Sequence, residues 1–115
     1  MSEALRAEHR LATYGTLAPG EPNHHHLSRL KGRWLTGAVR GRLVELGWGA
    51  AQGYPAIILD SRADPVRVHV FESADLPGHW PRLDAFEGNE YVRVVVSVAL
   101  DAGGEVDAMI FAAKD

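Results

Sequence analysis

A glycine-containing stretch near the start of the sequence, Tyr14–Gly20, offers groups that bind negative charge. Its letters are YGTLAPG, and it follows a short apolar run over 9–13. The backbone N–H groups of Gly15, Thr16 and Leu17, with the Thr16 hydroxyl, could line a concavity for a carboxylate or a developing oxyanion. Gly15 has no Cβ and can let another group approach the backbone closely. The same residues also fit an ordinary glycine turn between a strand and the next element.

A carboxylate that could transfer protons lies late in the chain, at the end of a predicted helix. This helix is expected over 79–88, with Pro81 in its first turn and Gly88 just beyond its end. Glu87 would then face the negative end of the helix macrodipole, which favours the protonated form and raises its pKa, especially if it is buried. A carboxyl group of raised pKa can act first as a general base and then as a general acid.

Three consecutive histidines, His24–His26, raise the hypothesis of a metal site. Neighbouring residues on a helix point about 100° apart, so the three side chains cannot converge on one ion. A site that joins His24 or His26 to a distant partner stays open, beside the simpler interpretation of a solvated polar helix start. The sequence has no cysteine, which excludes disulfides, thiolate catalysis and cysteine-ligated zinc. Because the usual ligand spacings are missing around these histidines, we predict no metal site.

Length and composition indicate a single soluble domain. At 115 residues the chain can bury a core without metal or disulfide support. It carries 12 Lys and Arg against 15 Asp and Glu, a net charge of −3, and no basic stripe predicts a nucleic acid or a membrane as partner. No apolar segment is long enough to span a bilayer or resembles a signal peptide, so we expect a cytoplasmic protein. Residues 1–8 are expected to form a flexible tail before one domain over 9–115.

The apolar pattern predicts the elements that must position these groups. The segment 66–72 alternates, with valines on one face, and 91–100 continues the same period of two. Helices are expected between Asn23 and Gly32 and over 79–88, where Leu83 and Phe86 would dock the second helix. The pattern favours an α+β fold, a small mixed β-barrel of about six strands with two short flanking helices. The predicted strands are 9–13, 34–46, 56–59, 66–72, 91–100 and 105–112.

Three motifs, in this order, resemble those of the γ-glutamylcyclotransferase-like superfamily. Tyr14–Gly20 resembles its Y-G-[ST]-L loop, and Gly53–Ala56 resembles the YPA stretch of its small bacterial and AIG2-like members. Leu83–Gly88, followed by Tyr91–Arg93, resembles its helix-borne glutamate segment. The resemblance covers most of residues 11–112.

The resemblance implies a fold, an activity and a set of site residues. The fold is a small mixed barrel, and no metal or organic cofactor is implied. In the implied reaction, the α-amine of a small γ-glutamyl amine or amide attacks its own γ-carbonyl, which yields 5-oxoproline and a free amine. Glu87 would be the general acid/base, while the leaving amine and the oligomeric state stay undetermined. The implied substrate-binding residues are Tyr14, Gly15, Thr16, Leu17, Tyr54, Tyr91 and Arg93.

Two residues depart from the pattern expected of the family. Phe111 stands in the last strand, where members often carry an aromatic hydroxyl, and His69 stands where an acidic or small residue is expected. Arg93 could pair with a substrate carboxylate, or it could form a structural ion pair with Asp84 or Glu90. The alternative function is a non-catalytic module that binds a carboxylate compound on the same barrel.

Overall fold

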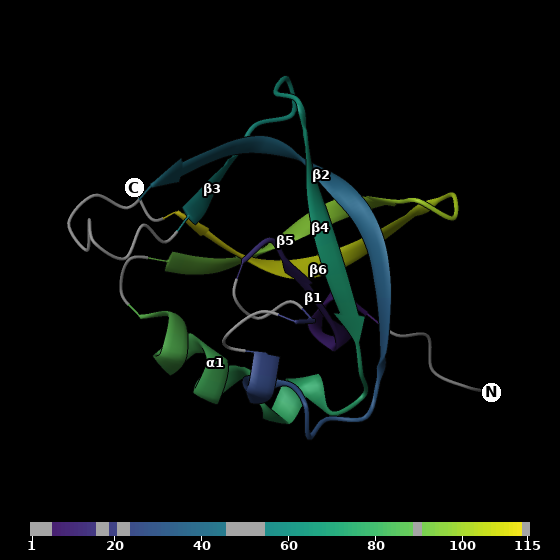
Figure 1. Ribbon diagram of the computed structural model, residues 1–115, viewed down its shortest axis with the longest axis vertical. Coiled ribbons are helices and arrows are strands. Elements are labelled where there is room, and N and C mark those ends of the chain that lie inside the picture. Colours follow the sequence, from purple (N-terminus) through teal and green to yellow (C-terminus); the bar gives the residue numbers. More distant parts are fainter. Residues whose placement is uncertain (1–5, 16–18, 21–23, 46–54, 89–90, 114–115) are drawn as a thin grey trace.

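Six strands and four short helices make up the described part of the chain. The computed structural model describes residues 6–15, 19–20, 24–45, 55–88 and 91–113 (Figure 1). Within these residues, no helix combines the length and the apolar character that crossing a membrane requires. The helices are the α-helix α1 (Trp80–Glu87) and the 3₁₀-helices η1 (Ala7–His9), η2 (His24–His26) and η3 (Leu76–Gly78). The strands are β1 (Arg10–Thr13), β2 (Arg33–Glu45), β3 (Pro55–Leu59), β4 (Pro65–Glu72), β5 (Tyr91–Leu100) and β6 (Glu105–Ala113).

The strands form one mixed sheet that closes into a barrel. Neighbouring strands follow the order β1, β4, β2, β3, β6 and β5, and further pairings of β1 with β6 and of β2 with β5 close the sheet. β1 and β6 are parallel, with Leu11 opposite Met109 and Ala12 opposite Ile110. The first and last strands therefore lie side by side. The predicted α+β class with a small mixed barrel is confirmed.

The long strand β2 changes neighbours along its length, and its glycines allow close approach. Its first part pairs with β4 and its last part with β3, while β5 pairs at Gly37 and Ala38. A Cβ on Gly37 would lie 2.5 Å from the Ala99 carbonyl oxygen, and one on Gly41 would lie 2.7 Å from that of Ile58. A side chain at either position would push neighbouring strands apart, so glycine keeps the barrel closed here.

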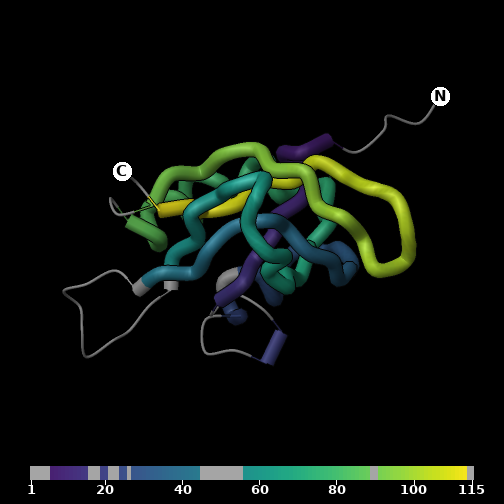
Figure 2. Tube along the Cα trace, turned by 90° about the horizontal axis from the view of Figure 1, so that it is seen from above, coloured from purple at the N-terminus to yellow at the C-terminus, as the bar shows by residue number. Residues whose placement is uncertain are grey.

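Apolar clusters lie on both sides of the sheet because successive strand residues face opposite sides. On β4, Val68 and Val70 point into the barrel, whereas Phe71 packs on its outer face. Figure 1 shows α1 and the 3₁₀-helices gathered along one side of the barrel, and Figure 2 shows the β5–β6 turn projecting from one end. The inner cluster is Ala12, Val39, Ile57, Val68, Val70, Val98, Ala108, Ile110 and Ala112. The outer cluster is Leu11, Leu27, Phe71, Leu76, Trp80, Leu83 and Phe111.

The two helical segments differ in how closely they follow the prediction. α1 has Pro81 in its first turn, and Gly88 caps its end with φ of 84°, a conformation that glycine adopts easily. Between Asn23 and Gly32 the described residues form the 3₁₀-helix η2 and turns, so this segment is tighter than the expected α-helix. Leu27 is nevertheless buried in the outer cluster. The segment is held by this packing and by turn hydrogen bonds from the Leu27 N–H to the His24 carbonyl oxygen and from the Leu30 N–H to that of Leu27.

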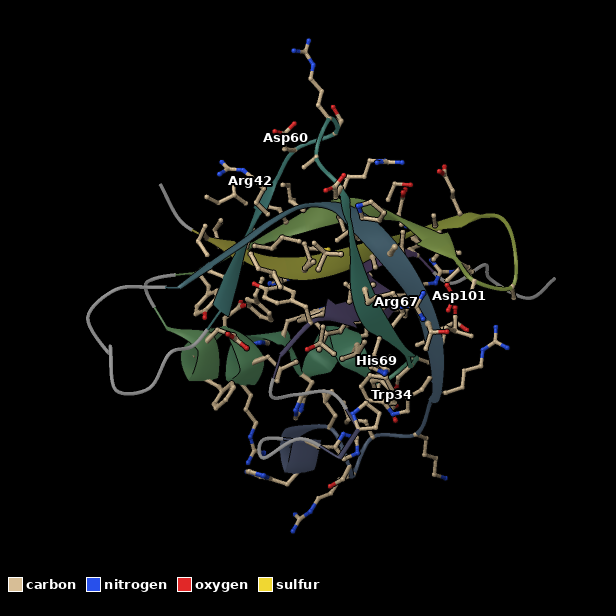
Figure 3. The ribbon with its side chains drawn as sticks, turned by 45° about the horizontal axis from the view of Figure 1, so that its top comes forward. Trp34, Arg42, Asp60, Arg67, His69 and Asp101 are labelled. Atoms are coloured by element: carbon tan, nitrogen blue, oxygen red, sulfur yellow. The ribbon has the colours of Figure 1, made fainter. Side chains whose placement is uncertain are left out.

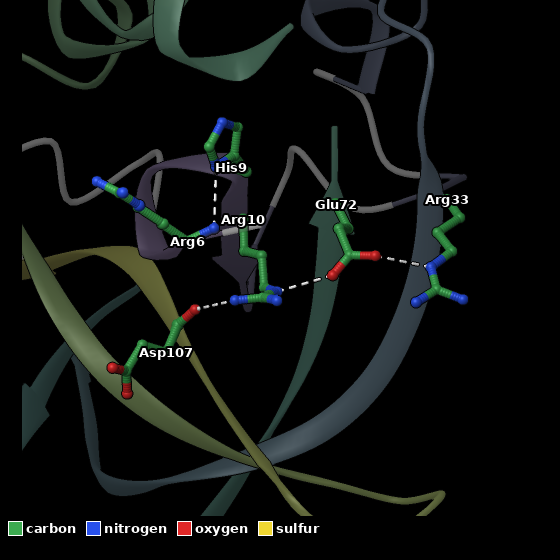
Figure 4. Close-up of polar contacts among 6 residues, drawn as sticks. All are labelled: Arg6, His9, Arg10, Arg33, Glu72 and Asp107. Carbon is green, nitrogen blue, oxygen red and sulfur yellow. Dashed lines mark hydrogen bonds and ion pairs between the residues drawn. The ribbon is translucent and has the colours of Figure 1, made fainter. Parts of the chain in front are cut away.

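A buried carboxylate links neighbouring strands at one end of the barrel. Glu72, 7% exposed, accepts hydrogen bonds of 2.8 Å from the Nε atoms of Arg10 on β1 and Arg33 on β2 (Figure 4). Arg10 also donates a 3.0 Å bond to the carbonyl oxygen of Asp107 on β6. Burial acts to raise the pKa of Glu72, but the hydrogen bonds and charges of the two arginines outweigh it, so the pKa lies below its ordinary value. The network therefore keeps an ionised carboxylate inside the fold.

Candidate active site

Glu87 lies on the face of α1 that packs against the barrel. Trp80, Leu83 and Glu87 are spaced i, i+3 and i+7, so they share one side of the helix. Trp80 is 4% exposed and Leu83 is fully buried, which draws the half-buried Glu87 side chain in with them. Burial disfavours the carboxylate and raises the pKa of Glu87 from 4.5 to about 7. The carboxyl group can therefore both accept and donate a proton near neutral pH.

Phe86 is exposed, so the packing of α1 differs from the prediction that Leu83 and Phe86 dock it. Its side chain is 37% exposed, whereas Trp80 takes the expected packing position beside Leu83. The reason is the helical period: Phe86 is turned about 100° from Glu87, away from the buried face. The buried face of this helix thus ends in a carboxylate instead of an aromatic ring.

The Tyr14 hydroxyl joins the end of β1 to two other strands. It donates a 2.5 Å hydrogen bond to the Phe111 carbonyl oxygen on β6 and accepts a 3.0 Å bond from the Ile57 N–H on β3. Burial, with smaller effects of Tyr91 and Glu87, raises the pKa of Tyr14 above its ordinary value, although the bond from Ile57 opposes the shift. Tyr14 therefore stays protonated near neutral pH and holds the start of the loop in place.

Three predicted site residues are close enough for their charges to interact. The pKa of Tyr14 responds to both Tyr91, at the start of β5, and Glu87, at the end of α1. These residues are more than 70 positions apart along the chain from Tyr14, yet the barrel brings them together. The charge of the glutamate segment thus acts on the beginning of the Y-G-T-L loop.

Gly15, the next residue of the loop, is half-buried, but the space into which a Cβ would extend is open among the described residues. Its backbone φ is not positive, and its N–H donates a long 3.4 Å bond to the Thr13 hydroxyl. A Cβ built on Gly15 would meet no atom of the described residues within 4 Å. Neither its backbone conformation nor its described neighbours require glycine here. Thr16, Leu17 and Tyr54 lie outside the described residues.

Arg93 forms the structural ion pair that the sequence left as one alternative. Its Nε and one terminal nitrogen donate to the two carboxylate oxygens of Asp84, at 2.8 and 3.1 Å. The guanidinium also lies over the ring of Trp80, 4.6 Å from its centroid. The bidentate pair had a signal in the sequence, a nearby Asp and Arg, but the stacking on Trp80 could not be predicted because it depends on how α1 folds back onto β5.

A second group of polar and aromatic side chains lies elsewhere, on the outer faces of β2 and β4 (Figure 3). His69 meets the edge of Trp34 with ring centroids 6.4 Å apart, and Arg67 pairs with Asp101 at 2.7 Å. The hydrogen bonds from Arg67 and Thr36 lower the pKa of Asp101 to about 2. A shallow cavity of about 290 Å³ beside them is lined by Trp34, Leu35, Thr36, Leu100, Asp101 and Ala102. This carboxylate is too acidic for proton transfer near neutral pH.

The histidine cluster does not add a metal site to the described part of the chain. Among the described residues, no group of three or more His, Asp or Glu side chains could hold a metal ion. His24 instead packs against Trp34, with ring centroids 5.6 Å apart.

Known proteins resemble this chain in sequence and in fold. The chain is 37% identical over 62 residues to "Putative gamma-glutamylcyclotransferase CG2811" of Drosophila melanogaster, a stretch that is 54% of this chain and 34% of that protein. YkqA of Bacillus subtilis superposes with a TM-score of 0.70 at 26% identity, over 91% of this chain and 35% of YkqA. An AIG2-like protein of Mus musculus gives a TM-score of 0.70 at 23% identity, over 90% of this chain and 75% of the mouse chain, which shows the shared fold.

The extent of the matches decides what they establish. The chain spans about a third of the length of the Drosophila relative and of YkqA. The sequence model of the family described as "Gamma-glutamyl cyclotransferase, AIG2-like" matches residues 11–115, which is nearly the whole chain. This protein therefore belongs to the AIG2-like gamma-glutamyl cyclotransferase family.

Proposed function

We propose that this protein closes the ring of a small γ-glutamyl amine or amide, releasing 5-oxoproline and an amine, with Glu87 as general acid/base. The observation that carries the proposal is the half-buried carboxyl of Glu87, which has a pKa of about 7 and whose charge acts on Tyr14 at the start of the loop. Membership of the family supports a cyclotransferase activity in general terms. The substrate class and the roles of individual residues are our proposal.

The reaction would begin with a proton transfer to Glu87. The α-ammonium group of the substrate is not a nucleophile until it loses a proton, and a carboxylate of raised pKa suits this step. The α-nitrogen then attacks the γ-carbonyl carbon of the same molecule, which forms the C–N bond of the ring and an oxyanion. Acid/base help of this kind is worth about 10²–10⁴ in rate. Because the substrate supplies its own nucleophile, the protein needs none.

The loop would stabilise the oxyanion, and Glu87 would then return its proton. The candidate donors are the backbone N–H of Gly15 and those of residues 16 and 17, and one such donor is worth roughly 2.7–4 kcal/mol where tested. When the carbonyl re-forms, the bond to the leaving amine breaks and the amine takes the proton held by Glu87. The ring nitrogen loses its second proton to solvent, from which the released amine takes one, so charges and atoms balance.

The direct test is a panel of γ-glutamyl dipeptides and γ-glutamyl amines, with 5-oxoproline as the measured product. We expect at least one member of the panel to be converted. Thermal unfolding is measured in parallel, because a ligand that binds the folded state raises its melting temperature. A compound that stabilises the protein and yields no product would favour the alternative, a non-catalytic binding module.

The rate of the proposed reaction should depend on pH through Glu87. Since the carboxylate form is the base, kcat/KM is expected to rise as pH increases through about 7, the pKa of Glu87. A falling limb at higher pH would belong to the α-amino group of the substrate, whose pKa is measured separately by titration. A profile that is flat between about pH 5 and about pH 8 would contradict the role of Glu87 as base.

Gly15→Ala should reduce turnover without harming the fold. The backbone φ suits alanine and the described neighbours leave space for a methyl group, so stability should be unchanged or higher by up to about 1 kcal/mol. The methyl group would occupy space next to the proposed oxyanion donors, and we expect at least about a tenfold loss of kcat/KM. The matched control is Gly78→Ala, another site with open space and no positive φ, which should keep full activity. Equal activity of the two variants would show that ligand does not approach Gly15.

A further inference from the structure

We propose that Arg93 is a positioning residue for Glu87, which holds α1 against β5 and so fixes how deeply the Glu87 side chain sits. The sequence resemblance had placed Arg93 among the substrate-binding residues, so this inference assigns it a different task. The effect of this positioning on catalysis rests on the proposed function. Its structural part can be tested with no substrate present.

The ion pair closes a short loop that carries Glu87. Asp84 and Arg93 are nine residues apart, and the chain between them contains the last turn of α1, the cap at Gly88 and the start of β5. Glu87 follows Asp84 by three residues, on the adjacent turn of the helix. A bidentate bond between the ends of this loop therefore restrains the segment in which Glu87 lies.

A second contact restrains the rotation of the helix about its axis. Arg93 touches α1 at two points, the carboxylate of Asp84 and the ring of Trp80, which are four residues apart. Trp80 shares the buried face with Glu87, and its indole N–H donates a 2.8 Å bond to the Glu8 carbonyl oxygen. Its ring also meets the edge of Phe111, with centroids 6.3 Å apart. Turning α1 about its axis would break these contacts and change how deeply Glu87 is buried.

The guanidinium of Arg93 is paired with Asp84, and its charge is not the cause of the raised pKa of Glu87. Two of its nitrogens bond both oxygens of Asp84, and the Arg93 side chain is 26% exposed. The raised pKa of Glu87 comes from burial. The charged groups that affect the pKa of Tyr14 are Tyr91 and Glu87, and Arg93 is not among them. Arg93 therefore acts on Glu87 through the geometry of α1.

The experiment compares Arg93→Met, Arg93→Lys and Asp84→Asn. The titration of the Glu87 carboxyl is followed by NMR without substrate, and kcat and KM are measured with a substrate from the panel. If the pair fixes α1, Arg93→Met and Asp84→Asn both release Glu87 toward water, so both lower its pKa from about 7 toward 4.5. Both should lower kcat by about tenfold or more with little change in KM, since small misplacements of catalytic groups are costly. Arg93→Lys keeps the positive charge but cannot form the bidentate pair with Asp84. Its Glu87 pKa and its kcat should lie between those of the other two variants and those of the native protein.

Two results would overturn the inference. If the two variants move the pKa of Glu87 in opposite directions, the effect is one of charge, because Met removes a positive group and Asn a negative one. If Glu87 titrates unchanged while Arg93→Met raises KM and Asp84→Asn does not, Arg93 binds substrate. Should Arg93→Met fail to fold, Arg93→Lys and Asp84→Asn carry the same comparison. Absence of product in every protein would count against the proposed function alone, because the titration of Glu87 still decides the positioning role.

Discussion

Glu87→Gln is expected to abolish 5-oxoproline formation while the barrel stays folded. Glutamine has nearly the same shape as glutamate but can neither accept the proton of the α-ammonium group nor return it to the leaving amine. We expect a loss of at least about 10²-fold in kcat, within the usual worth of acid/base help. The measurement is product release at saturating substrate, together with a circular dichroism spectrum that should match the native protein.

The stability of the same variant gives an independent check. The pKa of Glu87 is raised in the folded state, so the folded protein binds more protons than the unfolded chain between pH 4.5 and about 7. Ionised Glu87 therefore costs stability as pH rises through this window, and Glu87→Gln should be at least as stable as the native protein at pH 8. Glu105→Gln, at an exposed position on β6, is the matched control and should change neither activity nor stability. Full turnover in Glu87→Gln would remove Glu87 from the mechanism.

Glu72→Ala is expected to destabilise the fold more than any surface change. It would leave the guanidinium of Arg10, whose side chain is 13% exposed, without its carboxylate, and breaking a buried pair costs about 3–5 kcal/mol. That loss is a large part of the roughly 5–15 kcal/mol that stabilises a typical domain. Urea unfolding at neutral pH measures it, with the midpoint falling and the slope unchanged.

The pH dependence of this network has the opposite sign to that of Glu87. The pKa of Glu72 is lowered in the folded state, so its stabilising effect is present above the ordinary value of 4.5 and is lost as pH falls through the lowered folded value. Asp101→Asn is the matched control, because it breaks an arginine–carboxylate pair whose side chains are 69% and 43% exposed. Solvent screens that pair, so Asp101→Asn should lower the free energy of unfolding far less than Glu72→Ala does. An equal loss in both variants would mean that burial of Glu72 does not matter.

Local patterns predicted the elements well, because they depend on neighbouring residues. The alternation over 66–72 and 91–100 predicted two strands, and Pro81 and Gly88 predicted both ends of the helix that carries Glu87. The buried face of this helix was predicted less well. The spacing from Leu83 favoured Phe86 as the second buried residue, but Phe86 is exposed and Glu87 is half-buried. Nothing in the local sequence indicates that a carboxylate takes the inward position.

Contacts between distant segments could not be predicted. The pairs that Glu72 makes with Arg10 and Arg33 span 62 and 39 residues, and the three side chains look like ordinary surface charges in the sequence. The two bonds of the Tyr14 hydroxyl depend on the register of β3 and β6, which no local pattern specifies. Only the ordered motifs of the family placed Tyr14 and Glu87 in one predicted site.

The seam between β1 and β6 has a consequence for how the protein is made. A ribosome releases Leu11 and Ala12 nearly a hundred residues before their partners Met109 and Ile110, so the seam cannot form until β6 has been made. The acceptor of the Tyr14 hydroxyl, the Phe111 carbonyl, emerges equally late. Long-range closure of this kind slows folding, because chain entropy is lost before the contacts compensate for it. A chain in which β6 is not yet made therefore lacks both the seam and the anchor of the Y-G-T-L loop, so closure of the barrel waits for this strand.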